Sequence, residues 1–232
     1  MPYESRRVGT VEITPLCDAV GPMGPSLRRP FQETFLGATH DEGEWILHFH
    51  CYLLRGDEGH VTLVDTGIGP TSDWAPAPGH LLRELAAVGV EPGDVDTVII
   101  THMHSDHYGG TVVDGKPVFR NARHIVQAAE PNPLGELMTT VDGDAEVAPG
   151  VWVRHTPGHT PGHQIVETGE FTLAADILHH PVQLADPTIR YVHDHDADLA
   201  SRTRIALVER LRAERRLLGT AHFPEPFVQL GE

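Results

Sequence analysis

Cysteine, lysine and long apolar runs are all scarce in this 232-residue chain. Its two cysteines, Cys17 and Cys51, form neither a CxxC metal motif nor a disulfide framework, and we interpret both as small buried side chains. No apolar run approaches the ~20 residues that a membrane helix needs, and the first residues lack the apolar core of a signal peptide. We therefore expect a cytoplasmic protein that has no membrane partner.

Positive charge is also scarce. Lys and Arg total 17 against 33 acidic residues, which gives a formal net charge of −16, and Lys116 is the only lysine. Such a surface repels phosphate backbones, so the sequence argues against a nucleic-acid partner. A bound metal would reverse the charge locally. We expect a neutral or weakly charged small molecule as the substrate, and nothing in the sequence indicates a homo-oligomer.

The apolar and charged fractions, 40% and 22%, are typical of a globular protein. No low-complexity tract or linker divides the chain, so we expect one domain over residues 1–232. Short β-rich runs predict strands. These runs cover residues 8–16, 45–54, 61–65, 98–101, 124–126, 151–155, 164–167 and 171–175.

Two apolar stripes at helical spacing predict helices. One covers residues 81–88 and is stopped by Gly89; the other covers residues 199–218 and is stopped by Gly219, with Asp196 or Asp198 as its N-cap. Helices that fall between groups of strands indicate sheets with helices on their outer faces. Residues 18–44 are rich in Gly and Pro and are expected to form a functional loop.

Histidine is abundant, with 17 residues, and four potential metal ligands are concentrated in T-H-M-H-S-D-H-Y-G-G, residues 101–110. This block follows the apolar run V-I-I, so it begins at the end of a strand. Side chains two positions apart on extended backbone point the same way, which lets His102 and His104 face one cation. The turn that follows can direct Asp106 and His107 toward a second cation nearby.

Further candidates come after other strand-like runs. They are the block H-T-P-G-H-T-P-G-H (residues 155–163), Asp176 after F-T-L-A-A, and His222 in T-A-H-F-P. Loops at one edge of a sheet would bring these groups together. Two metal sites need about three protein ligands each and a shared anion, which this set supplies.

In order and spacing, these motifs resemble those of the metallo-β-lactamase superfamily, from Val8 to Pro224. The resemblance implies an α/β fold, a four-layer αβ/βα sandwich. It also implies that His102, His104 and His159 hold one metal, that Asp106, His107 and His222 hold a second, and that Asp176 bridges them. Asp65, in L-V-D-T-G, resembles the acid of the family that orients the ligands.

Within the superfamily, the motifs A-D-I-L-H-H-P-V-Q and A-H-F-P-E-P most resemble the lactonase, organophosphate-hydrolase and esterase branch. No cysteine occupies a ligand position and Asp176 supplies a bridge, unlike in the β-lactamases. His104 stands where a diiron oxygen-reducing relative has Glu. The chain has no room for the C-terminal helical domain typical of glyoxalase II.

The expected function is hydrolysis by two divalent metal ions. A nitrogen-and-oxygen ligand set suits zinc, and also Mn, Fe or Co. We expect a hydroxide between the metals to attack an ester or lactone carbonyl. Asp106 is the candidate that passes a proton to the leaving group. The alternatives are a thioesterase, a phosphoester or phosphotriester hydrolase and, outside enzymes, a metal-dependent binding or sensing module.

Neighbouring histidines need a separate interpretation. His155 and His163 flank His159, and we interpret both as structural groups beside the metals. His179 and His180 follow Asp176 closely. The sequence is equally consistent with two roles for them, contact with the substrate or an ordinary loop position in which the ring nitrogens are hydrogen-bonded. The pocket walls are expected from residues 18–44 and 178–195, without individual substrate-binding residues.

Overall fold

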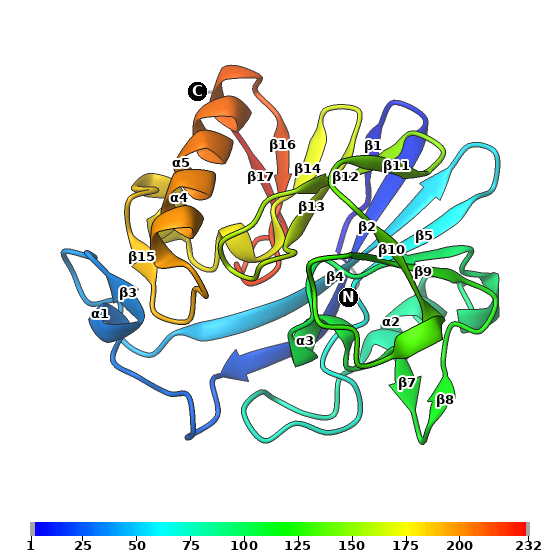
Figure 1. Cartoon of the computed structure of the whole chain (residues 1–232), viewed down its shortest axis with the longest axis horizontal. Helices are drawn as coiled ribbons and strands as arrows, with labels where there is room; N and C mark the ends of the chain where they lie inside the picture. Colours follow the sequence, from blue (N-terminus) through cyan, green and yellow to red (C-terminus); the bar gives the residue numbers. More distant parts are fainter. Residues whose placement is uncertain (1–2, 231–232) are drawn as a thin grey trace.

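The computed structural model describes residues 3–230, in which two β-sheets stack face to face (Figure 1). The larger sheet has seven strands in the order β1-β2-β4-β5-β6-β9-β10. They are β1 (Arg6–Val8), β2 (Val11–Pro22), β4 (Ile46–Gly56), β5 (Val61–Val64), β6 (Thr97–Ile99), β9 (Arg123–Gln127) and β10 (Met138–Val141).

The second sheet has six strands in the order β11-β12-β13-β14-β16-β17. They are β11 (Ala145–Ala148), β12 (Val151–His155), β13 (Gln164–Thr168), β14 (Phe171–Leu173), β16 (Leu217–Gly219) and β17 (Phe227–Gln229). Two short ribbons pair β3 (Phe35–Leu36) with β15 (Arg190–Tyr191), and β7 (Val112–Val113) with β8 (Lys116–Pro117).

The helices lie outside the sheets. They are α1 (Phe31–Thr34), α2 (Leu81–Ala87), α3 (Ser105–Tyr108), α4 (Pro181–Ala185) and α5 (Ala197–Ala213), with 3₁₀ turns η1 (Pro92–Asp94), η2 (Gly135–Leu137) and η3 (Ala175–Ile177). No helix in the described part of the chain has the length and hydrophobicity needed to span a bilayer. The expected cytoplasmic location stays a prediction.

Burial of apolar side chains explains the layers. Between the sheets, Ile13 and Tyr52 of the first sheet belong to the same buried cluster as Phe171 of the second. On the outer faces, Leu85 of α2 packs with the first sheet and Leu207 of α5 packs with the second. The order helix, sheet, sheet, helix confirms the predicted αβ/βα sandwich, in which α2 and α5 lie on opposite sides (Figure 1). That residues 1–232 form one domain stays a prediction.

Several predicted boundaries were wrong. The strand predicted over residues 8–16 is divided between β1 and β2, because the chain turns at Gly9 with a φ of 57°. The helix predicted over 199–218 ends at Ala213, because the chain turns at Arg215 with a φ of 52° and Leu217–Gly219 then pairs as β16 beside β14. Its N-cap is Asp196, whose carboxylate accepts the Leu199 N–H at 2.9 Å. Residues 18–22 belong to β2, so the predicted loop begins later than expected.

Candidate metal centre

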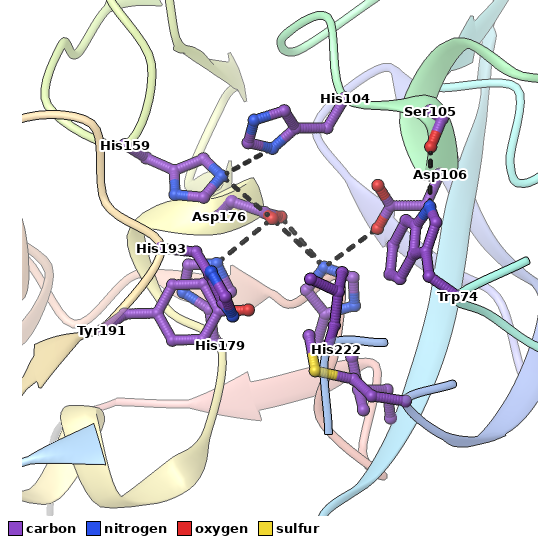
Figure 2. Close-up of a pocket in the computed structure, with 13 residues that line it drawn as sticks. Trp74, His104, Ser105, Asp106, His159, Asp176, His179, Tyr191, His193 and His222 are labelled. Atoms are coloured by element: carbon purple, nitrogen blue, oxygen red, sulfur yellow. Dashed lines mark hydrogen bonds and ion pairs between the residues drawn. The ribbon is translucent and has the colours of Figure 1, made fainter. Parts of the chain in front are cut away.

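All of the predicted ligands meet at one edge of the sandwich, where β6, β12, β14 and β16 end. One group contains His102, His104, His159 and Asp176, and a second contains Asp106, His107 and His222. Within each group the ligand atoms lie within 4.8 Å of one another. Figure 2 shows His104 and His159 on one side of Asp176, with Asp106 and His222 on the other.

The three histidines of the first group point their ring nitrogens at one another. His104 Nδ1 lies 3.0 Å from His102 Nε2 and 3.0 Å from His159 Nε2. A ring nitrogen carries either one hydrogen or one lone pair, so His104 Nδ1 cannot donate a hydrogen bond to one of these nitrogens and accept one from the other. Two nitrogens bound to one tetrahedral zinc at ~2.0–2.1 Å would lie about 3.3 Å apart. The spacing of the three ring nitrogens of His102, His104 and His159 therefore fits a bound cation.

Asp176 lies between the two groups. Its Oδ1 is 3.2 Å from His107 Nε2 and 3.1 Å from His222 Nε2, and its Oδ2 is 3.5 Å from His159 Nε2. The chain reaches this position through a left-handed residue, Ala175, with a φ of 44°. Oδ1 therefore faces the second group, while Oδ2 lies between the first group and His222, whose Nε2 is 3.3 Å away. A carboxylate between the two groups is placed where a bridging ligand would lie.

The second group combines oxygen and nitrogen donors. Asp106 Oδ2 lies 3.4 Å from His107 Nε2 and 3.7 Å from His222 Nε2. His107 Nε2 and Asp176 Oδ1 are buried and have no hydrogen-bond partner among the described residues. Buried polar atoms are normally satisfied, so these two atoms also fit a bound cation.

The two groups differ in electrostatics. Burial lowers the pKa of His159 to about 3 and also lowers that of His102 well below its ordinary value, so both rings are neutral. Burial alone would lower the pKa of His107 too, but Asp176, Asp106 and Asp65 together raise it well above its ordinary value. The second group is thus the more strongly negative environment.

Asp65 contacts one of the predicted ligands, His107. Its Oδ2 accepts from His107 Nδ1 at 2.7 Å and from the Thr101 hydroxyl at 2.9 Å, while its Oδ1 accepts the Thr101 N–H at 2.8 Å. Asp65 is therefore outside the ligand groups and fixes the ring of His107. His222 is held similarly, by the His48 carbonyl 2.9 Å from its Nδ1.

Two buried carboxylates that support the site were missed in the sequence. Glu130 accepts the N–H groups of Met103 and Gly162 at 2.8 Å each, so it ties the His102–His104 segment to the loop of His159. Asp194 Oδ1 lies 3.0 Å from His159 Nδ1. Neither has a spacing that marks it, because both contacts join segments far apart in the chain.

The other histidines of the motifs lie outside the two ligand groups. His163 Nε2 accepts the Asp176 N–H at 3.2 Å, and His155 Nε2 lies 2.9 Å from the Pro161 carbonyl. His180 Nδ1 accepts the Val182 N–H at the start of α4. His179 differs, because it faces the cavity with Nε2 3.2 Å from Asp176 Oδ2 and its ring stacked on Tyr191.

A cavity of about 370 Å³ opens directly onto the two groups. Its apolar wall consists of Met23, Leu27, Leu47 and Trp74. Its polar wall adds Ser105, His179, Tyr191 and His193 to the predicted ligands, and none of the described residues that line it is lysine or arginine. Both predicted wall segments, residues 18–44 and 178–195, contribute to this lining, whereas Leu47 and Trp74 lie outside them.

The Metallo-beta-lactamase superfamily profile matches residues 50–220 of the chain. An N-acyl homoserine lactonase of a Bacillus species is 31% identical over 172 residues, which cover 62% of this chain and 68% of that protein. Other Bacillus lactonases are matched over little more than half of their length.

Solved structures superpose on nearly all of the chain. AidC, a dizinc quorum-quenching lactonase in complex with a product, superposes with a TM-score of 0.82 at 20% identity, covering 100% of this chain and 97% of that one. An N-acyl homoserine lactone hydrolase with N-hexanoyl-L-homoserine at its catalytic metal centre gives a TM-score of 0.71 at 25% identity, covering 94% and 95%.

The chain therefore belongs to the metallo-β-lactamase superfamily, as its motifs predicted. The names of the relatives agree with the predicted enzyme class, a metal-dependent hydrolase of ester bonds.

Proposed function

We propose that the protein is a dinuclear metal-dependent hydrolase that opens a lactone or cleaves an ester in a neutral small molecule. The observation that carries this proposal is the position of Asp176, whose carboxylate lies between two separate groups of ligand atoms at the floor of one cavity. His102, His104 and His159 would hold one metal, and Asp106, His107 and His222 the other.

The residues of the chain have three tasks in this reaction. Two divalent cations, when bound, would polarise the carbonyl and make water acidic enough to supply hydroxide at neutral pH. Met23, Leu47 and Trp74 would hold the apolar part of the substrate and exclude water around the reacting bond. Water adds across the C–O bond, so the carbonyl carbon gains a hydroxyl and the leaving alkoxide gains a proton.

Asp106 is assigned to that proton transfer. Its carboxylate lines the cavity beside His222, so it can reach an alkoxide leaving from the carbonyl carbon. The absence of lysine and arginine from the lining favours a neutral substrate over an anionic one. The named lactonase relatives make N-acyl homoserine lactones the lactones to test first.

A substrate panel on zinc-loaded protein tests the proposal. It contains an N-acyl homoserine lactone, an aryl ester, a thioester and a phosphotriester, and metal content is measured on the same sample. We expect about two metal equivalents per chain and the highest kcat/KM for the lactone or the ester. Faster turnover of the thioester or the phosphotriester would replace the proposed substrate class. Bound metal without any turnover would indicate a binding or sensing module.

A further inference from the structure

Arg204 is an unusual residue for a helix on the outer face of the sandwich. It lies in α5, yet its side chain is 0% exposed and is the largest fully buried side chain among the described residues. Burying a guanidinium is costly unless its donors are paired. Its Nε donates to the Ile177 carbonyl at 2.7 Å, and its Nη1 donates to the Ile189 carbonyl at 2.7 Å.

The third contact of Arg204 leads to the metal centre. Its Nη2 donates to Asp194 Oδ2 at 3.0 Å, and the other oxygen of Asp194 lies 3.0 Å from His159 Nδ1. The Asp194 side chain is also 0% exposed. Because a carboxylate only accepts, this contact requires the hydrogen of a neutral His159 to be on Nδ1. The lone pair on Nε2 then faces His104 and Asp176, where a cation would sit.

The same arginine also supports the bridging position. Ile177, whose carbonyl Arg204 holds, directly follows Asp176. The main chain adds to the connection between α5 and the His159 loop, since Asp196 N–H donates to the Gly158 carbonyl at 2.9 Å. Gly158 packs so tightly that a Cβ there would lie 2.4 Å from Ala200 of α5. Helix α5 therefore contacts two of the segments that carry ligands.

We propose that the buried Arg204–Asp194 pair is a positioning device that sets the tautomer and direction of His159 and so prepares the three-histidine group for its cation. Neither residue lines the cavity, so both act through His159 and the Asp176 segment. This inference rests on the proposed function only in taking His159 as a ligand. It makes no use of the substrate.

Asp194→Asn is the variant that tests this proposal most directly. An Asn side chain keeps the size of Asp but has a single acceptor oxygen, and its amide must face either Arg204 or His159. If the amide faces Arg204, two donors oppose each other. If it faces His159, the hydrogen of that ring must move to Nε2, which blocks the ligand nitrogen. Partners of metal-binding histidines typically contribute ~10–100-fold to affinity, and we expect a loss of that size.

Glu167→Gln is the matched control. Glu167 is another well-buried carboxylate paired with arginine, with its Oε1 2.6 Å from Arg210 Nη2 and its Oε2 3.1 Å from Arg154 Nε, and it contacts none of the proposed ligands. Zn²⁺ affinity is measured by competition with a chromophoric chelator on metal-free protein. We expect both variants to lose thermal stability, but only Asp194→Asn to bind one of its two Zn²⁺ ions, the one at the three-histidine group, ~10–100-fold more weakly. Unchanged affinity in Asp194→Asn, or an equal loss in Glu167→Gln, would overturn the proposal.

A readout without metal or substrate keeps the inference testable if Asp194→Asn folds poorly. Imidazole ¹⁵N shifts of metal-free wild-type protein should show His159 protonated at Nδ1, and Arg204→Lys should give a mixture of tautomers. Protonation of wild-type His159 at Nε2 would refute the proposal. A protein that shows the expected tautomer and binds Zn²⁺, but hydrolyses no lactone or ester, would refute the proposed function and leave this inference standing.

Discussion

The two groups of predicted metal ligands are built from different parts of the chain. The group of His102, His104 and His159 joins two loops, consists mainly of neutral rings, and is supported from behind by Glu130 and Asp194. The group of Asp106, His107 and His222 takes two predicted ligands from one turn and lies among the carboxylates of Asp176, Asp106 and Asp65.

This difference concerns the contacts that position the side chains of each group. Carboxylates attract a cation strongly, and the second group takes its predicted ligands from the local turn of α3 and one residue from afar. In the first group, Asp194 holds the ring of His159, while Glu130 holds the backbone of the two segments that carry the histidines. In the second group, Asp65 and the His48 carbonyl hold the rings of His107 and His222. Asp176 is the element common to both, and the following predictions start from it.

Asp176→Ala should have the largest effect, because it removes a donor from both groups. We expect the variant to lose most of both metals and to lose activity by more than the ~10–100-fold typical of supporting residues. Elemental analysis and kcat/KM measure the two effects. The proposed bridge would be wrong if this protein kept two metal equivalents.

His159→Ala and His222→Ala should separate the two groups. Each is expected to remove one metal equivalent and most of the activity, His159→Ala from the first group and His222→Ala from the second. His155→Ala and His163→Ala serve as neighbours of His159 outside the groups. Cobalt spectra should show the loss of different sites. If His163→Ala lost a metal while His159→Ala kept both, the motif would have been assigned in the wrong register.

Asp65→Asn and Glu130→Gln should weaken one group each, by ~10–100-fold in metal affinity. Asp65→Asn acts on His107, while Glu130→Gln places an amide against a backbone N–H at the joint between the His102–His104 segment and the His159 loop. Glu136→Gln, at an exposed position, is the control for the second variant. Competition titrations with Zn²⁺ should show weaker binding at the group of His107 in Asp65→Asn, and at the group of His102, His104 and His159 in Glu130→Gln. Weaker binding at the same group in both variants would contradict these separate roles.

Glu167→Gln should have the smallest effect on the site and act only on stability. Arg210 and Arg154 outweigh burial and lower the pKa of Glu167 below its ordinary 4.5. The lowered pKa contributes stability that is present above pH ~4.5 and is lost as the pH falls through the folded value. The variant should therefore be about 1–2 kcal/mol less stable than wild type near pH 7, with the gap closing at acidic pH. Urea unfolding at pH 7 and pH 3.5 measures this, and a constant gap would contradict it.

Sequence patterns predicted the elements best where they are local. The strand pair at residues 45–54 and 61–65 is present as β4 and β5, and Gly89 ends α2 with a φ of 73°. The failure at residues 214–218 has a physical cause. Leu217 and Leu218 continue the apolar spacing of α5, yet pairing with β14 and β17 satisfies their backbone in a strand.

The sequence by itself predicted that the polar side chains of the His102–His107 block lie together, because a short segment at the end of a strand has few ways to point its side chains. Its motif order also predicted the superfamily and the sandwich. Tertiary structure alone decided that Arg204 of an outer helix reaches Asp194 and His159, that Glu130 joins two ligand loops, and that His179 faces the cavity. These contacts join segments whose separation along the chain carries no periodic signal, so only the packed fold brings them together.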